Sequence, residues 1–199
     1  CADAPLQVGA LPVPAVADWA GKGRTDVIVG NSAGELLYLA NRGAPEQPAF
    51  GPIHSVTAGG KRVRVAAGSS GSIQGPSEYK FGYTCPSAAD WNGDGRPDLL
   101  MSDIHGQHLF LRNLGGEPPR FAAPVPLTVN GRPLVTVWRV RPAVADWQND
   151  GQRFYVTLDE NGVLATYARL SDQELGPKQL LTYADGTPIR FTEDVGGGL

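Results

Sequence analysis

The chain has 199 residues, of which 26 are glycine and 17 are proline, so turn-forming residues exceed their usual share. Both residues interrupt helices, and this composition therefore predicts an all-β protein of short strands and tight turns. The net charge of -3 leaves no overall positive field to recruit nucleic acid. At 41% hydrophobic residues the sequence is too apolar for a disordered chain, and it lacks an apolar run long enough to span a membrane as a helix.

The chain opens on Cys1 instead of methionine, so we expect an upstream piece to have been removed. Cys1 followed by Ala2 and Asp3 is compatible with the lipidated start of a mature bacterial lipoprotein, and trimming of the chain is the alternative. Cys1 and Cys85 could also pair with each other, with two free or buried cysteines as the other possibility.

Three segments of the chain share one pattern, which begins at an Ala-Asp-Trp triplet with its aspartate at Asp18, Asp90 or Asp146. A glycine-rich loop, a strand, a tight turn and a second strand follow each triplet. A further hairpin turn comes later, at residues 58–60, 130–131 and 185–186. Each repeat therefore predicts a four-stranded antiparallel blade, and blades repeated radially form a β-propeller. A β-sandwich would not predict the same loop three times.

The predicted organisation is one partial propeller over residues 1–199. Its blades span about 11–60, 85–133 and 141–190, with an insertion between blades at 59–84. Three blades cannot close a ring, because propellers have about four to eight. Either the missing blades lie in a longer parent chain, or copies associate as a homo-oligomer. We favour the fragment, because the repeats differ from one another as blades of one long chain do.

The loop of the second repeat carries oxygen ligands at alternate positions. They are the side chains of Asp90, Asn92, Asp94 and Asp98 and the main-chain carbonyl of Arg96. Alternating oxygens on a curled loop are what a hard cation needs, so we predict a Ca²⁺ site. The loop is not an EF-hand, because Met101 stands where a bidentate glutamate would be. An asparagine- and aspartate-rich turn without metal is the alternative.

The other two loops have less complete ligand sets. In the first, we expect the Lys22 ammonium to take the place of a cation between Asp18 and Asp26. In the third, Phe154 replaces the last acid, which leaves a weaker metal candidate. The tryptophans that follow the three anchor aspartates are predicted to pack in the core between blades: Trp19, Trp91 and Trp147.

The run from Asp90 to Leu99, Asp-Trp-Asn-Gly-Asp-Gly-Arg-Pro-Asp-Leu, resembles the FG-GAP or VCBS repeat. The resemblance covers nearly the whole chain as three units, of which the second has the full motif. It implies a calcium-loop propeller of the kind found in integrin α-subunits, lectins and propeller-type polysaccharide lyases. The stretch from Lys80 to Pro86 is similar to secreted bacterial VCBS proteins, several of which are grouped with carbohydrate degradation. A secreted, periplasmic or cell-surface location follows from this resemblance.

The strand order predicts that the metal loops and the variable loops lie on opposite faces. If residues 87–89 form the innermost strand, the turn at 103–106 and the 59–84 insertion lie at the end away from the metal loop. This variable face would gather Tyr79, Lys80, Tyr83, His105, Trp138, Arg139 and Arg141. Aromatic rings stack on sugars and guanidinium groups bind carboxylates, so the set suits an acidic polysaccharide or other glycan.

Polysaccharide lyase chemistry by β-elimination is the leading hypothesis for this face. An arginine or lysine, with Arg139 as the first candidate, would neutralise a uronate carboxylate. His105 would abstract the C5 proton, and Tyr83 or else Tyr79 would protonate the leaving oxygen. The substrate-binding residues would be Tyr79, Lys80, Trp138 and Arg141. Two alternatives stay open: a non-catalytic lectin or adhesion module, and a structural propeller segment. His105 is equally explained as an exposed turn residue, and Arg139 as part of a solvated strand edge.

Overall fold

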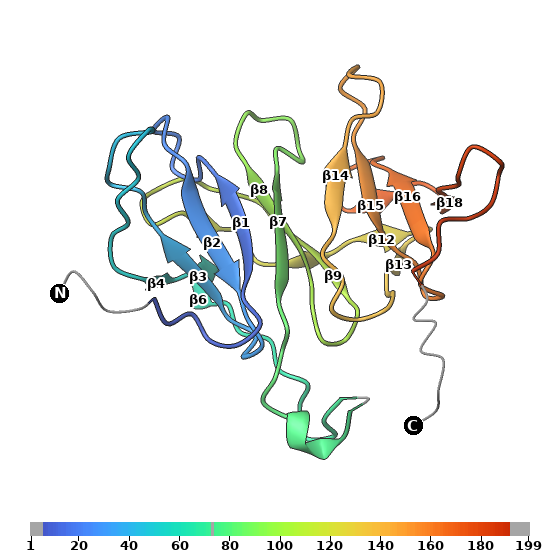
Figure 1. The fold of residues 1–199 in the computed structure, drawn as a ribbon, viewed down its shortest axis with the longest axis horizontal. Helices are drawn as coiled ribbons and strands as arrows, with labels where there is room; N and C mark the ends of the chain where they lie inside the picture. The colour runs from blue at the N-terminus through green and yellow to red at the C-terminus, as the bar shows by residue number, and fades with distance from the viewer. Residues whose placement is uncertain (1–5, 73, 192–199) are drawn as a thin grey trace.

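The computed structural model describes residues 6–72 and 74–191, and their regular structure is almost entirely β (Figure 1). The one helix in these ranges is the short 3-10 helix η1, Pro76–Glu78. The strands are β1 Val13–Ala17, β2 Asp26–Gly30, β3 Leu36–Leu39, β4 His54–Ser55, β5 Thr57–Ala58, β6 Lys61–Arg62, β7 Cys85–Ala89, β8 Asp98–Ser102, β9 His108–Leu111, β10 Arg120–Phe121, β11 Val125–Pro126, β12 Thr128–Val129, β13 Arg132–Pro133, β14 Ala143–Ala145, β15 Phe154–Leu158, β16 Leu164–Ala168, β17 Glu174–Leu175 and β18 Gln179–Leu180. The predicted all-β class is confirmed. No helix of the described residues is long and apolar enough to cross a membrane.

Three four-stranded antiparallel sheets follow one another along the chain. The first sheet has the order β1-β2-β3-β4, the second β11-β9-β8-β7, and the third β14-β15-β16-β18. In the second sheet, for example, β7 pairs with β8 from Cys85 opposite Ser102 to Ala89 opposite Asp98. Figure 1 shows the sheets arranged as an open arc, with β1, β7 and β14 next to one another along its inner side. The described residues do not form a closed ring.

Two small sheets link each large sheet to the next. The hairpin β5–β6 turns at Gly59 and Gly60, and β5 pairs in parallel with β10 from the following repeat. The hairpin β12–β13 turns at Asn130 and Gly131, and β12 pairs in parallel with β17. Both turns lie where the sequence predicts them, and all four turn residues have the positive φ that such turns require.

Two apolar cores fill the spaces between neighbouring sheets. The first lies between the first and second sheets, where the Trp19 ring packs edge-on against Phe121 with centroids 6.0 Å apart. The second lies between the second and third sheets, where Trp91 packs in the same way against Tyr155 at 6.1 Å. Trp19 and Trp91 are therefore core residues, as predicted. The same prediction is wrong for Trp147, which is 54% exposed, because no following sheet among the described residues covers it.

The segment between β6 and β7, residues 63–84, is called the insertion below; the first residues of the predicted 59–84 segment belong to the β5–β6 hairpin instead. The insertion is held close to the β2–β3 turn. Gly34 has a φ of +75°, and a Cβ atom there would lie 2.0 Å from the carbonyl oxygen of Val65 and 2.8 Å from the Cα atom of Gly82. Only glycine at residue 34 permits this close approach, which fixes where the insertion begins and ends.

Candidate functional site

The loops of the arc separate into two faces, as the strand order predicts. The loops after β1, β7 and β14 lie together at one edge, called the loop face, at the top of Figure 1. The insertion, with η1 at its tip, projects from the opposite edge, called the insertion face. A group on one face therefore does not act directly on a ligand bound at the other.

The loop of residues 90–98 on the loop face is closed by its own side chains. One carboxylate oxygen of Asp90 accepts a hydrogen bond from the Gly93 amide at 2.8 Å. The side-chain oxygen of Asn92 accepts from the Asp94 amide at 2.8 Å, and Asp94 Oδ1 accepts from the Arg96 amide at 3.0 Å. Bonds of this kind bring alternate oxygens onto one curled loop, and each oxygen keeps a further lone pair.

Asp98 differs from the other acidic residues of this loop because it is completely buried. Its Oδ1 accepts a hydrogen bond from the Asn113 amide at 2.8 Å, and its Oδ2 accepts from the Asn92 amide at 3.3 Å. Burial raises the pKa of Asp98 to about 6. Asp26, the equivalent residue of the first repeat, accepts a hydrogen bond from the Asn41 amide at 2.7 Å. This carboxylate therefore joins the first loop to the residues after β3, although that loop lacks the other predicted metal ligands.

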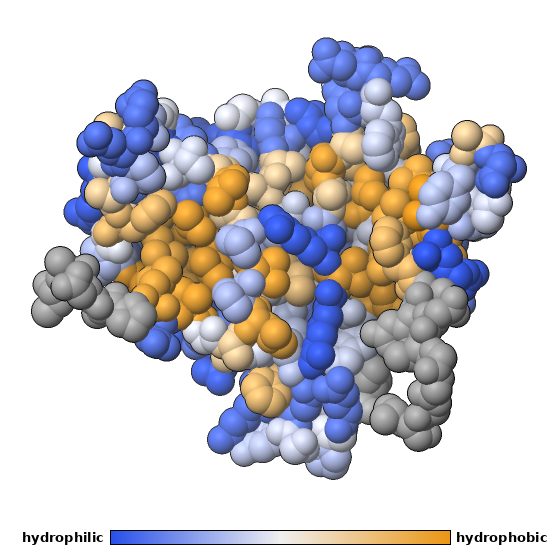
Figure 2. Space-filling model, viewed as in Figure 1, coloured by the Kyte–Doolittle hydropathy of each residue, from blue (hydrophilic) through white to orange (hydrophobic). Residues whose placement is uncertain are grey.

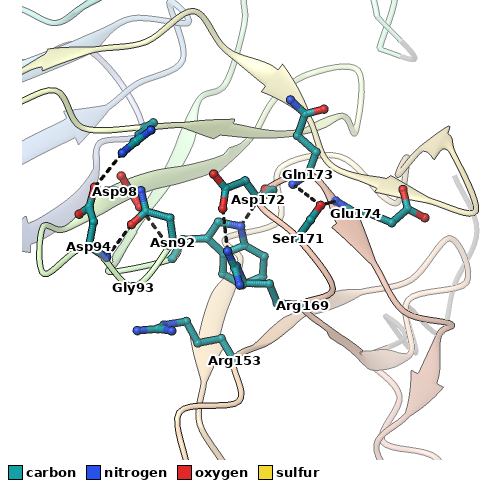
Figure 3. Close-up of polar contacts among 12 residues, drawn as sticks. Asn92, Gly93, Asp94, Asp98, Arg153, Arg169, Ser171, Asp172, Gln173 and Glu174 are labelled. Atoms are coloured by element: carbon teal, nitrogen blue, oxygen red, sulfur yellow. Dashed lines mark hydrogen bonds and ion pairs between the residues drawn. The ribbon is translucent and has the colours of Figure 1, made fainter.

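Two guanidinium groups stand beside the acidic side chains of the loop. Arg112 Nη2 lies 3.4 Å from Asp94 Oδ2, and Arg153 Nη2, from the third repeat, lies 3.5 Å from Asp90 Oδ2. Figure 3 shows Asn92, Asp94 and Asp98 close together, with Arg153, the residue before β15, on the same side of the loop as Gly93. The donor set is of the kind that Ca²⁺ prefers. Within residues 6–72 and 74–191, however, no three His, Cys, Asp or Glu side chains are gathered closely enough to hold a metal, and the Ca²⁺ site stays a prediction.

The equivalent loops are closed by the same bonds without the full ligand set. Asp18 accepts from the Lys22 and Gly23 amides at 2.8 and 2.6 Å, and Asp146 accepts from the Gly151 amide at 2.9 Å. The expectation that the Lys22 ammonium sits between two loop aspartates is wrong. Its Nζ forms an ion pair with Glu117, which extends from the second repeat toward the first loop.

A cluster of four side chains on the insertion face joins the insertion to the segment before β14. Its members, called the arginine cluster, are Glu78, Tyr83, Trp138 and Arg139. The Arg139 guanidinium carbon lies 3.6 Å from the centre of the Tyr83 ring and 3.8 Å from that of Trp138. Arg139 Nη2 is 3.2 Å from Glu78 Oε1, which also accepts a 2.6 Å hydrogen bond from the Tyr83 hydroxyl. The cation is thus held between two rings and one carboxylate.

The groups of the arginine cluster are fixed in both position and protonation. Glu78 and Tyr83 are buried. Burial and the hydrogen bond to Glu78 raise the pKa of the Tyr83 hydroxyl, while bonds from Ser72 and Tyr83 lower the pKa of Glu78. Tyr83 and Arg139 also have positive φ angles of 45° and 60°, which non-glycine residues adopt only where their surroundings hold them.

The remaining predicted residues of this face lie outside the arginine cluster. Tyr79 is 47% exposed, and the Lys80 ammonium is 5.1 Å from the centre of its ring. His105 is exposed in the turn after β8, with Nε2 3.2 Å from the carbonyl oxygen of Ala66. Arg141 donates a 2.7 Å hydrogen bond to the carbonyl of Pro14. The structure therefore brings Tyr83, Trp138 and Arg139 together and leaves Tyr79 and Lys80 facing solvent.

Sequence reasoning missed two buried polar groups. Glu78 is one acid among several aromatic residues of the insertion, a pattern that predicts a buried partner for a cation. His108, the first residue of β9, is buried between the second and third sheets. Its Nδ1 is 2.6 Å from the Tyr155 hydroxyl and its Nε2 is 2.8 Å from the Thr136 hydroxyl. Burial lowers the pKa of His108 to about 4.

Comparison with known protein families adds one finding about this region. Residues 90–153 match the family described as FG-GAP-like repeat. The part of the chain from the loop after β7 to the segment before β15 is therefore similar to an FG-GAP-like repeat. The match begins at Asp90 and ends at Arg153, so it spans the loop of residues 90–98 and reaches the equivalent loop of the third repeat. For these residues it confirms the resemblance to the FG-GAP repeat, and such a repeat suggests a β-propeller-type module. No curated protein matches the chain.

Proposed function

We propose that this chain is part of a β-propeller-type module that binds an acidic glycan through its insertion and does not cleave it. The observation that carries the proposal is the pair Tyr79 and Lys80, an exposed aromatic ring with an ammonium above it. No ion-pair partner of Lys80 occurs among the described residues. Phe81, 38% exposed, adds a second ring. Such a surface suits the apolar face of a sugar and its carboxylate.

The arginine cluster supports this proposal because it holds the insertion in place. Glu78 and Tyr83 lie on either side of Tyr79 in the sequence, and both are fastened to Arg139. Arg139 Nη2 also lies 3.4 Å from the side-chain oxygen of Gln74, which ties a further part of the insertion. A site that is already ordered loses less conformational entropy when its ligand binds.

The same contacts favour binding over β-elimination. A lyase needs a cation free to neutralise the uronate carboxylate and an acid free to protonate the leaving oxygen. Arg139 faces the carboxylate of Glu78, and the Tyr83 hydroxyl donates a hydrogen bond to that same carboxylate. Arg139 and Tyr83, two of the groups suggested for chemistry, are therefore engaged in holding the insertion.

The proposal also includes a Ca²⁺ ion, bound on the loop face, with a structural role. Asp90, Asn92, Asp94 and Asp98 would supply side-chain oxygens, and Arg96 its main-chain carbonyl. A bound cation would offset the repulsion among three carboxylates that lie within one short loop. A module that binds such glycans would work in a secreted, periplasmic or cell-surface setting, where these polymers are found.

Titration calorimetry with a defined uronate oligosaccharide tests the proposal. We expect saturable binding that weakens about tenfold or more in Tyr79→Ala, which corresponds to about 1.4 kcal/mol, and a similar loss in Lys80→Ala. The matched controls are Tyr183→Ala, which removes a tyrosine that is 58% exposed in the third repeat, and Lys61→Ala in β6. Both controls should bind as the unchanged protein does.

Two outcomes would count against the proposal. Absence of binding to uronate and sulfated oligosaccharides alike would remove the glycan-binding function. Growth of the ultraviolet absorbance of an unsaturated uronate, lost in His105→Ala or Tyr83→Phe, would replace binding by lyase chemistry.

A further inference from the structure

Each outer sheet of the arc has one side against which no other described sheet packs. In the third sheet, Ala143 pairs with Val156 and Leu158 pairs with Leu164, so these side chains share the side away from the second sheet. Together with Ala145, Phe154 and Trp147 they form the third-sheet end face. All of these residues are apolar, and all are at least partly exposed. A free surface of this composition is typical of a protein contact.

The first sheet has an end face of matching chemistry. The pairs Pro14 with Val29 and Val16 with Val27 put these four side chains on the side away from the second sheet. Leu37 and Leu39 continue the same side on β3, but they are buried, as is Val29. Val16 is 59% exposed, Pro14 is exposed and Val27 is half-buried, so the β1 margin of this first-sheet end face is open to solvent.

The two end faces repeat the two halves of an interface that the chain already contains. Trp147 occupies the place in its repeat that Trp19 and Trp91 occupy in theirs, and both of those are buried against the next sheet. In the second repeat, the positions equivalent to Val16, Val27 and Leu39 are occupied by Ala88, Leu99 and Leu111. These three residues pack in the first core opposite Trp19 and Ile28. The third-sheet end face therefore corresponds to the face that carries the tryptophan in the internal interface. The first-sheet end face corresponds to the apolar face that packs against this tryptophan.

Both end faces turn toward the same side of the molecule. Figure 2 shows apolar surface gathered over β1 to β3 and again over β14 to β16, with hydrophilic residues between them. A partner that approaches from this side meets both patches at once. A second three-sheet arc has the size and the complementary faces to do so.

We propose that two copies of this chain associate, which is the alternative to the longer parent chain that the sequence favours. The third-sheet end face of each copy packs on the first-sheet end face of the other. The two contacts are equivalent by a two-fold axis, so the assembly closes and leaves no end face free. Two copies of the three large sheets make a ring of six, within the range of about four to eight blades that propellers use. Trp147 of each copy packs against the first sheet of the other copy, as Trp19 packs against the second sheet within one chain.

Sedimentation velocity over a range of protein concentrations tests the association. The chain is expected to sediment as a two-copy species. Its tryptophan fluorescence should shift to the blue as the protein concentration rises, because association buries Trp147. Trp147→Asp and Val16→Asp should each give a folded single-chain species, because each variant spoils one half of both contacts. Tyr183→Asp, at a residue outside both end faces, should leave the association intact.

Mixing the two variants tests the pairing of unlike faces. Trp147→Asp keeps an intact first-sheet end face, and Val16→Asp keeps an intact third-sheet end face. A mixture therefore restores one of the two contacts and should form a mixed pair that neither variant forms with itself. Packing of two like end faces predicts no such restoration.

The proposal is overturned if the unchanged chain sediments as a single copy at every concentration. It is also overturned if Val16→Asp associates as well as the unchanged chain, or if the mixture shows no mixed pair. Circular dichroism and thermal unfolding of each variant establish that it is folded before these comparisons. Tyr79 and Lys80 lie outside both end faces, so loss of glycan binding and loss of association are separate results.

Discussion

The carboxylate of Glu78 lies 3.2 Å from the guanidinium of Arg139, although 61 residues separate the two in the sequence. This contact ties the insertion to the segment that leads into the third sheet. It also places the Arg139 cation between the rings of Tyr83 and Trp138, where a planar guanidinium stacks and an ammonium does not. The arginine cluster therefore anchors the insertion to the rest of the fold.

Replacing Arg139 by alanine should loosen the insertion. Loss of a cation packed on two aromatic rings should lower the free energy of unfolding by about 1–2 kcal/mol. Limited proteolysis should then cut within residues 63–84 faster than in the unchanged protein. Arg139→Lys should recover only part of the protection. Arg132→Ala, on the exposed strand β13, is the matched control, and equal cutting in all variants would contradict a role for Arg139 in holding the insertion.

His108 should make stability depend on pH. Its folded pKa of about 4 lies below the ordinary value of 6.5, so the unfolded chain binds the proton more readily. The stabilisation is complete above about pH 6.5 and is lost as pH falls through about 4, by a total of about 3 kcal/mol. Denaturant unfolding at several pH values measures this loss. His108→Gln should flatten the profile in that window; a slope as steep as that of the unchanged protein would assign the dependence elsewhere.

Calcium should stabilise the protein through the loop of residues 90–98. At a concentration 100 times its dissociation constant, a ligand of the folded state adds about 2.7 kcal/mol, which a thermal melt detects as a higher Tm. A chelator should reverse this gain, and Asp94→Ala should abolish it. Asp150→Ala changes the equivalent position of the third loop and should preserve most of the gain. Identical melting curves with calcium and with chelator would exclude an occupied site.

Trp91 should be among the most costly residues to remove. It is fully buried, and its indole Nε1 donates a 2.9 Å hydrogen bond to the carbonyl of Asp172 in the third repeat. Trp91→Ala should lower the free energy of unfolding by about 3–5 kcal/mol. Trp147→Ala should cost less than about 1 kcal/mol when measured at a dilution where the chain is a single copy. Similar losses at the two positions would show that Trp147 is buried within one chain.

The repeated parts of the fold follow from local chemistry and could be predicted. Asn130 and Gly131 adopt a two-residue turn on their own, and Asp90 closes its loop through amides only a few residues away. Alternation of side chains on short strands then places Leu100 and Phe110 on the side that meets the third sheet. Strand, turn and loop are short-range features, so a single repeat contains the information for each.

The partners of charged and aromatic side chains had to come from the tertiary structure. The sequence predicts aromatic and cationic residues on the insertion face, but only packing brings Arg139 onto Glu78 and leaves Lys80 in solvent. Lys22 likewise pairs with Glu117 of the next repeat and not with its own loop. Trp19, Trp91 and Trp147 occupy one position of the repeat, yet burial of each depends on whether another sheet follows. The sequence determines what each repeat can present; the neighbours in space decide which groups are covered, because burial and ion pairing act between residues far apart along the chain.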